Sequence, residues 1–311
     1  MSWSRRRGPA VLGAVLALAA TPAASHPVTS EAPPPAAVER PKRPEVVRVV
    51  AVGDIACAPG STVTETRCRH EETSDLARRL QPHRVLALGD LQYPIGSLTA
   101  FQKSYGPTWG RLRSITHPVL GNHEYQTTDA LGYYRYFRNR QPGPPGYYTR
   151  KYGTWRVFVL NSNCGYIDCA RQRQWFKQGL KKHRSRCTLV AMHHPRYTSS
   201  LGATLGKGVA KLAGVAYRRG VDLVLSGHEH SYERFRKLDA RGRRAKDGFV
   251  QLVVGSGGAS HRELVGPATG SEYQDDENFG VLRLSLRDGG YGFAFVTLDG
   301  ERPDRGKGRC V

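Results

Sequence analysis

Five short apolar runs in this chain each end in side chains that could bind a metal ion. They end at Gly53-Asp54, Gly89-Asp90, Gly121-Asn122-His123, His193-His194 and Gly227-His228-Glu229-His230. Runs this short and this rich in Val and Leu are typical of buried strands. Because ligands of α/β sheets bind beyond the carboxyl ends of the strands, we expect one rim to collect these side chains. Carboxylate, amide and imidazole groups from distant segments would then form a metal centre.

Helices alternate with strands in the first part of the chain, and strands dominate the last part. We expect strands over 46–52, 84–88, 115–120, 154–160, 187–192, 221–225, 249–254, 280–286 and 291–298. We expect helices over 71–80, 100–105, 171–182 and 209–219, and a loop over the aromatic, basic and Pro-rich stretch 132–146. This order predicts an α/β (α+β) fold of two packed mixed β-sheets flanked by helices.

The first 45 residues read as targeting and linker sequence. Arg5, Arg6 and Arg7 precede an apolar stretch over 10–20, and small residues follow. We interpret residues 1–25 as a secretory signal peptide, because the apolar stretch is too short to span a membrane. Residues 26–45 are expected to form a Pro-rich linker, which leaves 46–311 for one domain. The protein is therefore expected to be secreted or extracytoplasmic, with no other membrane segment.

The cysteine pattern fits an exported protein. The six cysteines are Cys57, Cys68, Cys164, Cys169, Cys187 and Cys310. An even number in an exported chain favours disulfides, and the absence of a CxxC pair disfavours a zinc site. Six cysteines allow 15 connectivities, so the pairing stays open. Local closure favours Cys57 with Cys68 and Cys164 with Cys169, and Cys187 then remains for Cys310.

The chain is strongly basic, with a formal net charge of +21. Such a field attracts anionic substrates or anionic cell-wall polymers. The arginines are spread along the chain and form no single tract, so no specific nucleic-acid readout is expected. A generally solvated basic surface explains the same composition.

The motifs as a set resemble the calcineurin-like metallophosphoesterases. They are Gly-Asp at 53–54, Gly-Asp-x-x-Tyr at 89–93, Gly-Asn-His-Glu at 121–124, Met-His at 192–193 and Gly-His-x-His at 227–230. Tyr93 and the longer tract Gly-His-Glu-His-Ser-Tyr-Glu-Arg at 227–234 narrow the resemblance to purple acid phosphatase-like members. The likeness runs from about Arg48 to Leu286. It implies a metallophosphoesterase-type sandwich and makes 46–311 the catalytic domain.

Residue by residue, the resemblance implies two metal ions that share one carboxylate. The first ion would be held by Asp54, Asp90, Tyr93 and His230, and the second by Asp90, Asn122, His193 and His228. A tyrosinate suits Fe³⁺, whereas imidazole and amide ligands suit Zn²⁺, Fe²⁺ or Mn²⁺ at the second position. Relatives outside the purple group place a histidine where this chain has Ala56, and Tyr93 would replace that ligand.

The implied activity is that of a secreted binuclear phosphatase acting on small phosphomonoesters through a metal-activated hydroxide. His123 would point at the substrate and either stabilise charge or protonate the leaving group. Glu124 would orient His123 or cap a helix, while His194 and Arg196 are candidates for supporting the site or lining the pocket. Purple acid phosphatases often carry a further histidine where an ungapped count gives Ala203. The leaving-group acid therefore stays open between His194 and His123.

Two other functions remain as alternatives. A phosphodiesterase or nucleotidase uses the same two-metal core, and the width of the pocket would decide between the activities. A non-catalytic secreted protein could use the basic surface to bind polyanions, but it would be expected to have lost ligands. All seven expected ligand positions carry competent side chains, which counts against that reading. The sequence leaves the oligomeric state open.

Overall fold

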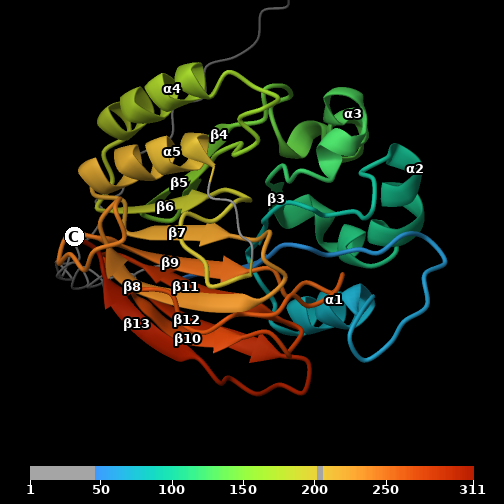
Figure 1. Ribbon diagram of the computed structural model, residues 1–311. Coiled ribbons are helices and arrows are strands. Elements are labelled where there is room, and N and C mark those ends of the chain that lie inside the picture. Colours follow the sequence, from blue (N-terminus) through green and yellow to red (C-terminus); the bar gives the residue numbers. More distant parts are fainter. Residues whose placement is uncertain (1–45, 202–205) are drawn as a thin grey trace, which may run out of the picture. The chain divides into compact units, whose positions relative to one another are not determined.

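The computed structural model describes residues 46–201 and 206–311 as two β-sheets that share a core (Figure 1). The expected signal peptide and linker, together with Ala203, lie outside the described residues. The six-stranded sheet has the order β13-β12-β11-β1-β2-β3. Its strands are β1 (Val47–Val52), β2 (Arg84–Ala87), β3 (Thr116–Pro118), β11 (Gly280–Arg287), β12 (Gly290–Thr297) and β13 (Arg305–Arg309). Strands β1, β2 and β3 are parallel, so their carboxyl ends lie at one edge.

The second sheet has seven strands in the order β10-β8-β9-β7-β6-β5-β4. They are β4 (Tyr148–Tyr152), β5 (Trp155–Val159), β6 (Cys187–Ala191), β7 (Leu223–Ser226), β8 (Tyr232–Leu238), β9 (Phe249–Val254) and β10 (Ser271–Asp275). Strands β5, β6, β7 and β9 are parallel, with antiparallel neighbours on both sides. The predicted fold of two packed mixed sheets is therefore confirmed.

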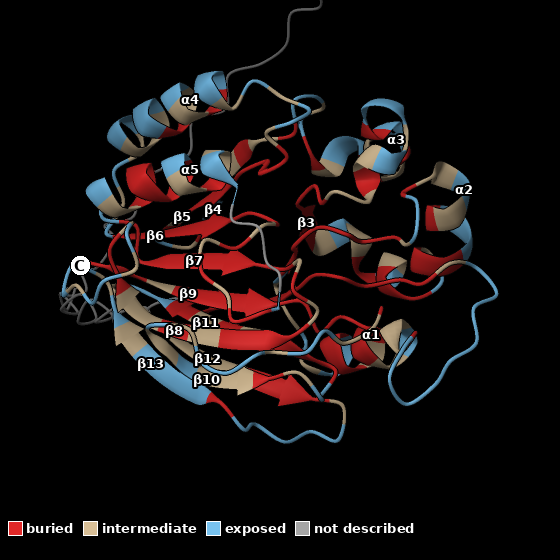
Figure 2. Cartoon of the chain, in the orientation of Figure 1, coloured by how far each residue is buried: buried red, intermediate tan, exposed pale blue. Residues whose placement is uncertain are grey.

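Strand β6 shows why the central runs are apolar throughout. Side chains alternate between the two faces of a strand. Leu189 and Ala191 enter the core between the sheets, whereas Val190 enters a second core beneath the helices. Both faces of this strand are buried (Figure 2), so neither face selects polar residues.

Three of the four predicted helices are present as α1 (His70–Arg79), α4 (Cys169–Lys182) and α5 (Lys207–Arg218), and the one predicted over 100–105 is the short π-helix η1 (Phe101–Tyr105). Asp168 caps α4 by accepting hydrogen bonds from the amides of Ala170 and Arg171. Helices α4 and α5 lie side by side over the seven-stranded sheet (Figure 1), and they bury residues such as Phe176 and Leu212 in the second core. Within the described part of the chain, no helix combines the length and apolar character needed to cross a membrane.

The prediction of a loop over 132–146 is wrong in its first half. The chain there forms α3 (Leu131–Phe137), followed by the 3-10 turn η5 (Arg138–Arg140). The remaining helical elements are α2 (Leu98–Ala100), η1 (Phe101–Tyr105), η2 (Trp109–Ile115), η3 (Glu124–Gln126), η4 (Thr128–Ala130), α3 (Leu131–Phe137) and η5 (Arg138–Arg140). Tyr133 and Phe137 are four residues apart and fully buried, and the Phe137 ring packs 5.6 Å from the ring of Phe101. Burial of these aromatic rings outweighs the polar and basic composition of the segment.

Four strands were missed by sequence analysis, namely β4, β8, β10 and β13. Each carries charged or glycine residues that hide the alternation expected of a strand. The clearest case is β13, which reads Arg-Gly-Lys-Gly-Arg and lies exposed at the edge of its sheet (Figure 2). The segment is a strand because it pairs with β12, and residue propensities within the segment do not indicate that pairing.

All six cysteines form disulfides, as expected for an exported protein. The pairs are Cys57–Cys68, Cys164–Cys169 and Cys187–Cys310. They are the pairs that local closure favoured. The third joins β6 of the seven-stranded sheet to the residue after β13 of the six-stranded sheet, across a sequence separation of 123.

Replacing Cys187 and Cys310 by Ser should destabilise the protein far more than replacing Cys164 and Cys169. The sequence separations of 123 and 5 predict losses of about 5 and about 2 kcal/mol, because a longer closed loop restrains the unfolded chain more. Thermal unfolding of both double variants measures the difference. Equal losses would show that the long-range bridge does not restrain the unfolded chain as this argument requires.

Candidate metal centre

The expected metal-binding residues lie where strand ends of the two sheets meet. The loops after β1, β2 and β3 carry Asp54, Asp90, Tyr93, Asn122 and His123, and the loops after β6 and β7 carry His193, His194, His228 and His230. The sequence predicted a single rim, whereas both sheets contribute. Asp90 from one sheet lies 3.2 Å from His193 of the other, measured from Oδ2 to Nε2. The shared core between the sheets therefore sets the geometry of the site.

One half of the centre surrounds the Tyr93 hydroxyl. That oxygen lies 2.9 Å from Asp54 Oδ1, 3.1 Å from Asp90 Oδ2 and 2.8 Å from His230 Nε2. Four potential ligand atoms thus converge on one point. Ala56 is fully buried, and its carbonyl accepts a 2.7 Å hydrogen bond from the Tyr93 amide. This backbone hydrogen bond holds the loop after β2 against the loop after β1, and the Tyr93 hydroxyl reaches Asp54 from there.

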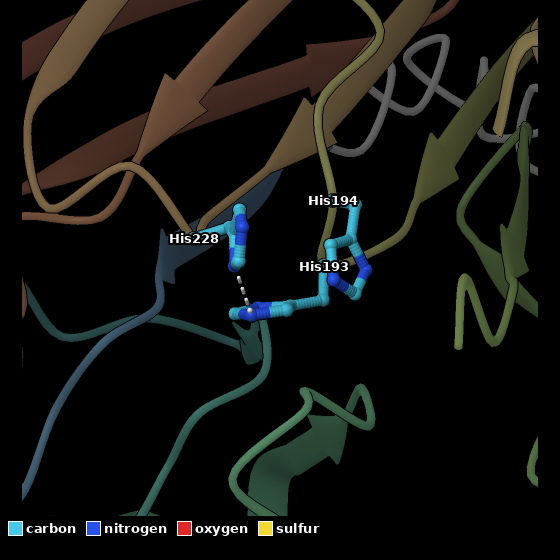
Figure 3. A group of neighbouring side chains, drawn as sticks. All are labelled: His193, His194 and His228. Atoms are coloured by element: carbon cyan, nitrogen blue, oxygen red, sulfur yellow. Dashed lines mark hydrogen bonds between the residues drawn. The ribbon is translucent and has the colours of Figure 1, made fainter. Parts of the chain in front are cut away.

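The other half surrounds the ring of His193. Its Nε2 lies 3.1 Å from Asn122 Oδ1 and 3.2 Å from His228 Nδ1. Figure 3 shows the His228 ring directed at His193, with His194 beside them. Nitrogen atoms of all three histidines lie within 4.8 Å of one another. Nitrogens spaced at about 3 Å suit ligands of one ion, because Zn–N bonds are about 2.0–2.1 Å long.

Asp90 connects the two halves. Its side chain is only 2% exposed, and its Oδ2 approaches both the Tyr93 hydroxyl and His193. Its Oδ1 accepts a 2.8 Å hydrogen bond from the His123 amide, which fixes the plane of the carboxylate. A carboxylate in this position can bridge two cations that would otherwise repel each other.

Burial strongly perturbs the titration of these groups. It raises the pKa of Asp54 to about 8 and lowers the pKa of His230 to about 4. Burial acts against charging His193 as well, but the negative charge and hydrogen bond of Asp90 raise the His193 pKa to about 9. Near neutral pH these shifts favour protonated forms of Asp54 and His193 and a neutral His230. Metal ions bind such groups by displacing the protons.

Hydrogen bonds on the outer side of two rings direct their free nitrogens into the centre. His193 Nδ1 lies 2.9 Å from the carbonyl oxygen of Leu88, and His230 Nδ1 lies 2.8 Å from Ser260 Oγ. A backbone carbonyl can only accept, so His193 carries a proton on Nδ1, and Nε2 is the nitrogen that can bind a metal ion once its own proton is displaced. Sequence analysis missed Leu88 and Ser260, because nothing in their local sequence indicates this role.

The backbone of the centre is held in unusual conformations. Asp54, Asp90, His228 and His230 have φ values of 60°, 48°, 77° and 37°. Left-handed backbone costs an ordinary residue of order 1 kcal/mol or more and persists only where surrounding structure imposes it. Four such residues at one centre indicate that placing these side chains toward one another outweighs the conformational cost to the backbone.

Close approach between loops explains the glycine that precedes several of these residues. A Cβ atom on Gly121 would lie 2.1 Å from Asp90 Oδ1, and one on Gly227 would lie 2.6 Å from Asp54 Oδ2. No side chain fits at either position without displacing a carboxylate. Gly121 and Gly227 therefore make room for the carboxylates, whereas a Cβ on Gly89 would instead lie 2.5 Å from the His193 ring.

Glu124, which was expected to orient His123 or cap a helix, binds backbone amides of two loops instead. Its buried carboxylate accepts hydrogen bonds from the amides of Gly121, Asp90 and Leu91, at 2.7, 3.0 and 2.9 Å. It holds together the loops after β2 and β3 and makes no hydrogen bond to His123. Burial and the charge of Asp90 raise the pKa of Glu124 to about 7.

His123 lies at the open side of the centre. Its side chain is 30% exposed, and its Nε2 is 3.9 Å from Asp90 Oδ2. Its Nδ1 lies 2.6 Å from the carbonyl oxygen of Pro94, which leaves Nε2 free to face a substrate. A cavity of about 350 Å³ is lined by Tyr93, His230 and Arg67 among others, and Tyr93 packs its ring 4.3 Å from the ring of His123. Arg67 was not singled out from the sequence.

The two remaining candidates differ in position. His194 Nδ1 bonds Ser162 Oγ at 2.7 Å, and its ring lies 4.4 Å from the ring of His228, so it borders the centre. Burial lowers the pKa of His194 to about 3. The Arg196 guanidinium instead donates to the carbonyl of Ala240, and the structure gives it no contact with the centre.

Comparison with known proteins agrees with this geometry. Residues 47–232 match the calcineurin-like phosphoesterase family, which covers more than half of the chain. Purple acid phosphatase 1 of Ipomoea batatas is 31% identical over 212 residues, covering 60% of this chain and 42% of that protein. Fe(3+)-Zn(2+) purple acid phosphatase 12 of Arabidopsis thaliana is 26% identical over 211 residues, covering 57% of this chain and 44% of that protein. The chain thus spans less than half the length of these two relatives.

A solved structure of a purple acid phosphatase from yellow lupin (Lupinus luteus) seeds has the same fold. It aligns with a TM-score of 0.67 at 18% sequence identity, over 85% of this chain and 54% of that chain. The family match, the relatives and the shared sandwich agree with the resemblance carried by the motifs. This chain belongs to the calcineurin-like phosphoesterase family and is similar to its purple acid phosphatase members.

Proposed function

We propose that this protein is a binuclear metal-dependent phosphatase that hydrolyses phosphomonoesters. The position of Asp90 is the observation that carries the proposal. One buried carboxylate oxygen lies 3.1 Å from the Tyr93 hydroxyl and 3.2 Å from His193 Nε2, between two converging sets of ligand atoms. Family membership supports a phosphoric ester hydrolase, and the partial coverage of the relatives leaves the substrate to be tested.

In this proposal the two sets of ligand atoms bind one metal ion each. Asp54, Asp90, Tyr93 and His230 hold the first ion, and Asp90, Asn122, His193 and His228 hold the second. The bound ions would polarise the phosphoryl oxygens and lower the pKa of a water to give the attacking hydroxide. The buried walls of the centre keep other water away from these groups, which strengthens every electrostatic interaction there.

His123 is the chain's own group for handling charge on the substrate. The Pro94 carbonyl fixes its ring through Nδ1, and Nε2 lies at the open side of the centre, 3.9 Å from Asp90 Oδ2. When Nε2 carries a proton, it can donate to a phosphoryl oxygen or to the leaving oxygen. His194 is a weaker candidate for the acid, because burial lowers its pKa to about 3 and keeps the ring neutral.

The side chains favour different metals at the two positions. A phenolate is a hard anion that suits Fe³⁺, so we assign iron to the Tyr93 position. Imidazoles and an amide suit Zn²⁺, Fe²⁺ or Mn²⁺ at the other position. The Arabidopsis thaliana relative whose name gives Fe(3+)-Zn(2+) supports the same combination.

We further propose that the protein works outside the cytoplasm. All six cysteines form disulfides, which persist in oxidising compartments. The expected signal peptide over 1–25 would explain export. The signal peptide and the linker over 26–45 remain predictions.

Tyr93→Phe should abolish the visible absorption of the purified protein if the first position holds Fe³⁺. A phenolate bound to Fe³⁺ gives a broad visible band, and phenylalanine has no oxygen to bind. Absorption spectra with metal analysis on the same samples measure this, with buried Tyr133→Phe, outside the centre, as the matched control. A wild-type protein holding iron without the band would mean that Tyr93 does not bind it.

Hydrolysis of p-nitrophenyl phosphate should exceed that of bis(p-nitrophenyl) phosphate in kcat/KM. Asp90→Asn should lower the faster of the two activities by at least about a thousandfold, because an amide bridges two cations poorly. Preference for the diester would favour the phosphodiesterase or nucleotidase alternative. Absence of both activities in metal-loaded protein would favour a polyanion-binding protein. Unchanged turnover in Asp90→Asn would refute the assigned site.

A further inference from the structure

The outer face of strands β11, β12 and β13 carries two rows of cations around a glycine. The pairing registers place Arg283 opposite Ala294 and Gly292 opposite Lys307. Because alternate residues share a face, Arg283 and Arg287 of β11 lie on the same face as Arg305, Lys307 and Arg309 of β13. A groove of about 710 Å³ runs over this face, and Arg283, Arg287, Lys307 and Arg309 are among its lining residues. We call it the cationic groove.

The spacing of the rows follows from sheet geometry. Strands lie about 4.8 Å apart, so two strands separated by one neighbour are about 9.6 Å apart. Each row runs over four residue-to-residue steps of strand, which cover about 13 Å. The charges therefore do not converge on one point, as they would for a single small anion. They flank a linear path.

These cations lack acidic partners among the described residues. None of Arg283, Arg287, Arg305, Lys307 and Arg309 has an Asp or Glu oxygen within 4.0 Å there. The one acidic residue lining the groove, Asp288, lies 3.6 Å from Arg186. Five cations held on a rigid sheet repel one another, and an anion would relieve that repulsion.

Gly292 forms the floor of the groove, and packing does not explain it. A Cβ atom there would meet nothing closer than the Gly306 carbonyl at 3.8 Å. By contrast, Cβ atoms on Gly306 and Gly308 would lie 2.8 and 2.4 Å from the Phe293 and Tyr291 rings. A glycine inside a strand costs about 0.5–1 kcal/mol relative to alanine and often marks close approach of a ligand. The bare floor leaves the path between the cation rows open.

A charged edge strand that resists aggregation is the simpler explanation for β13. It accounts for Arg305, Lys307 and Arg309, which lie at the edge of the sheet. It does not account for Arg283 and Arg287, which lie two strands inside that edge, nor for Gly292. The two rows and the bare floor together require a further reason.

We propose that the cationic groove binds an extended chain of phosphate groups, of the inorganic polyphosphate type, independently of the metal centre. Four of the five cations are arginines, whose planar guanidinium matches phosphate oxygens. Single-stranded nucleic acid fits less well, because its bases need aromatic stacking platforms. Tyr291 and Phe293 are among the residues lining the groove, but strand alternation directs their rings to the opposite face, where they pair with Leu286 and Leu284. The floor residues Gly292 and Ala294 also offer no bulky apolar side chains for inserting into a membrane.

Binding of an end-labelled inorganic polyphosphate, followed by fluorescence polarisation at several salt concentrations, tests this proposal. Lys307→Gln/Arg309→Gln should weaken binding about tenfold or more and flatten the salt dependence, because fewer phosphates are neutralised. Lys181→Gln/Lys182→Gln on α4 removes the same net charge from exposed positions elsewhere and should leave binding nearly unchanged. An equal loss in both variants would overturn the groove in favour of a general basic field.

Gly292→Val tests the shape of the groove without changing its charge. It adds a β-branched side chain where a Cβ meets only ordinary contacts, so thermal stability should be kept or raised while polyphosphate binding falls. Binding unchanged by this substitution would refute a ligand lying on the floor. Hydrolysis of p-nitrophenyl phosphate should stay the same in every groove variant, which separates this site from the metal centre.

Three further results would also overturn the proposal. One is loss of polyphosphate binding in Asp90→Asn, which would place the ligand at the metal centre. The others are tighter binding of single-stranded DNA than of polyphosphate, and binding that appears only with anionic lipid vesicles.

Discussion

The sharing of the buried Asp90 carboxylate between the two sheets is the constraint on which the site depends. This group follows a strand of the six-stranded sheet, yet its closest imidazole, His193, follows a strand of the seven-stranded sheet. Burying a carboxylate away from water is costly unless charge or hydrogen bonds compensate it. Here a backbone amide, a tyrosine hydroxyl and an imidazole compensate it, and a pair of cations would do so more fully. The packing of the two sheets therefore determines the distances between the side chains of the centre.

The backbone around Asp90 accepts a local cost to meet that constraint. Four residues of the centre have left-handed φ values. Gly121 and Gly227 are glycines because any side chain at either position would clash with a carboxylate of the centre. Glu124 stabilises the arrangement by binding three amides of the loops after β2 and β3. The outer sheet face is built differently, since the cationic groove keeps its charges apart and its floor bare. The six-stranded sheet thus contributes its strand ends to the proposed metal centre and its exposed face to the proposed anion-binding groove.

Much of the centre could be predicted because strand ends have a local signature. Apolar runs followed by Gly and a polar residue identify Asp54, Asp90 and Asn122, and the two-sheet fold follows from the order of elements. The roles of Leu88 and Ser260 could not be predicted, because they depend on contacts across the fold. The helix α3 was missed because its aromatic residues are interspersed with polar and basic ones, and β13 because its glycines and charges hide a strand. Arg196 was weighed as a pocket residue by its position in the chain, but its guanidinium turns to the Ala240 carbonyl.

Anomalous X-ray diffraction from crystals of the purified protein, measured on both sides of the iron and zinc absorption edges, tests the central claim most directly. The account predicts two metal peaks about 3.5–4 Å apart on either side of the Asp90 carboxylate. The iron signal should lie on the side of Tyr93 and His230, and the second metal on the side of His193 and His228. A single peak, or a pair of peaks that does not flank Asp90, would contradict the account.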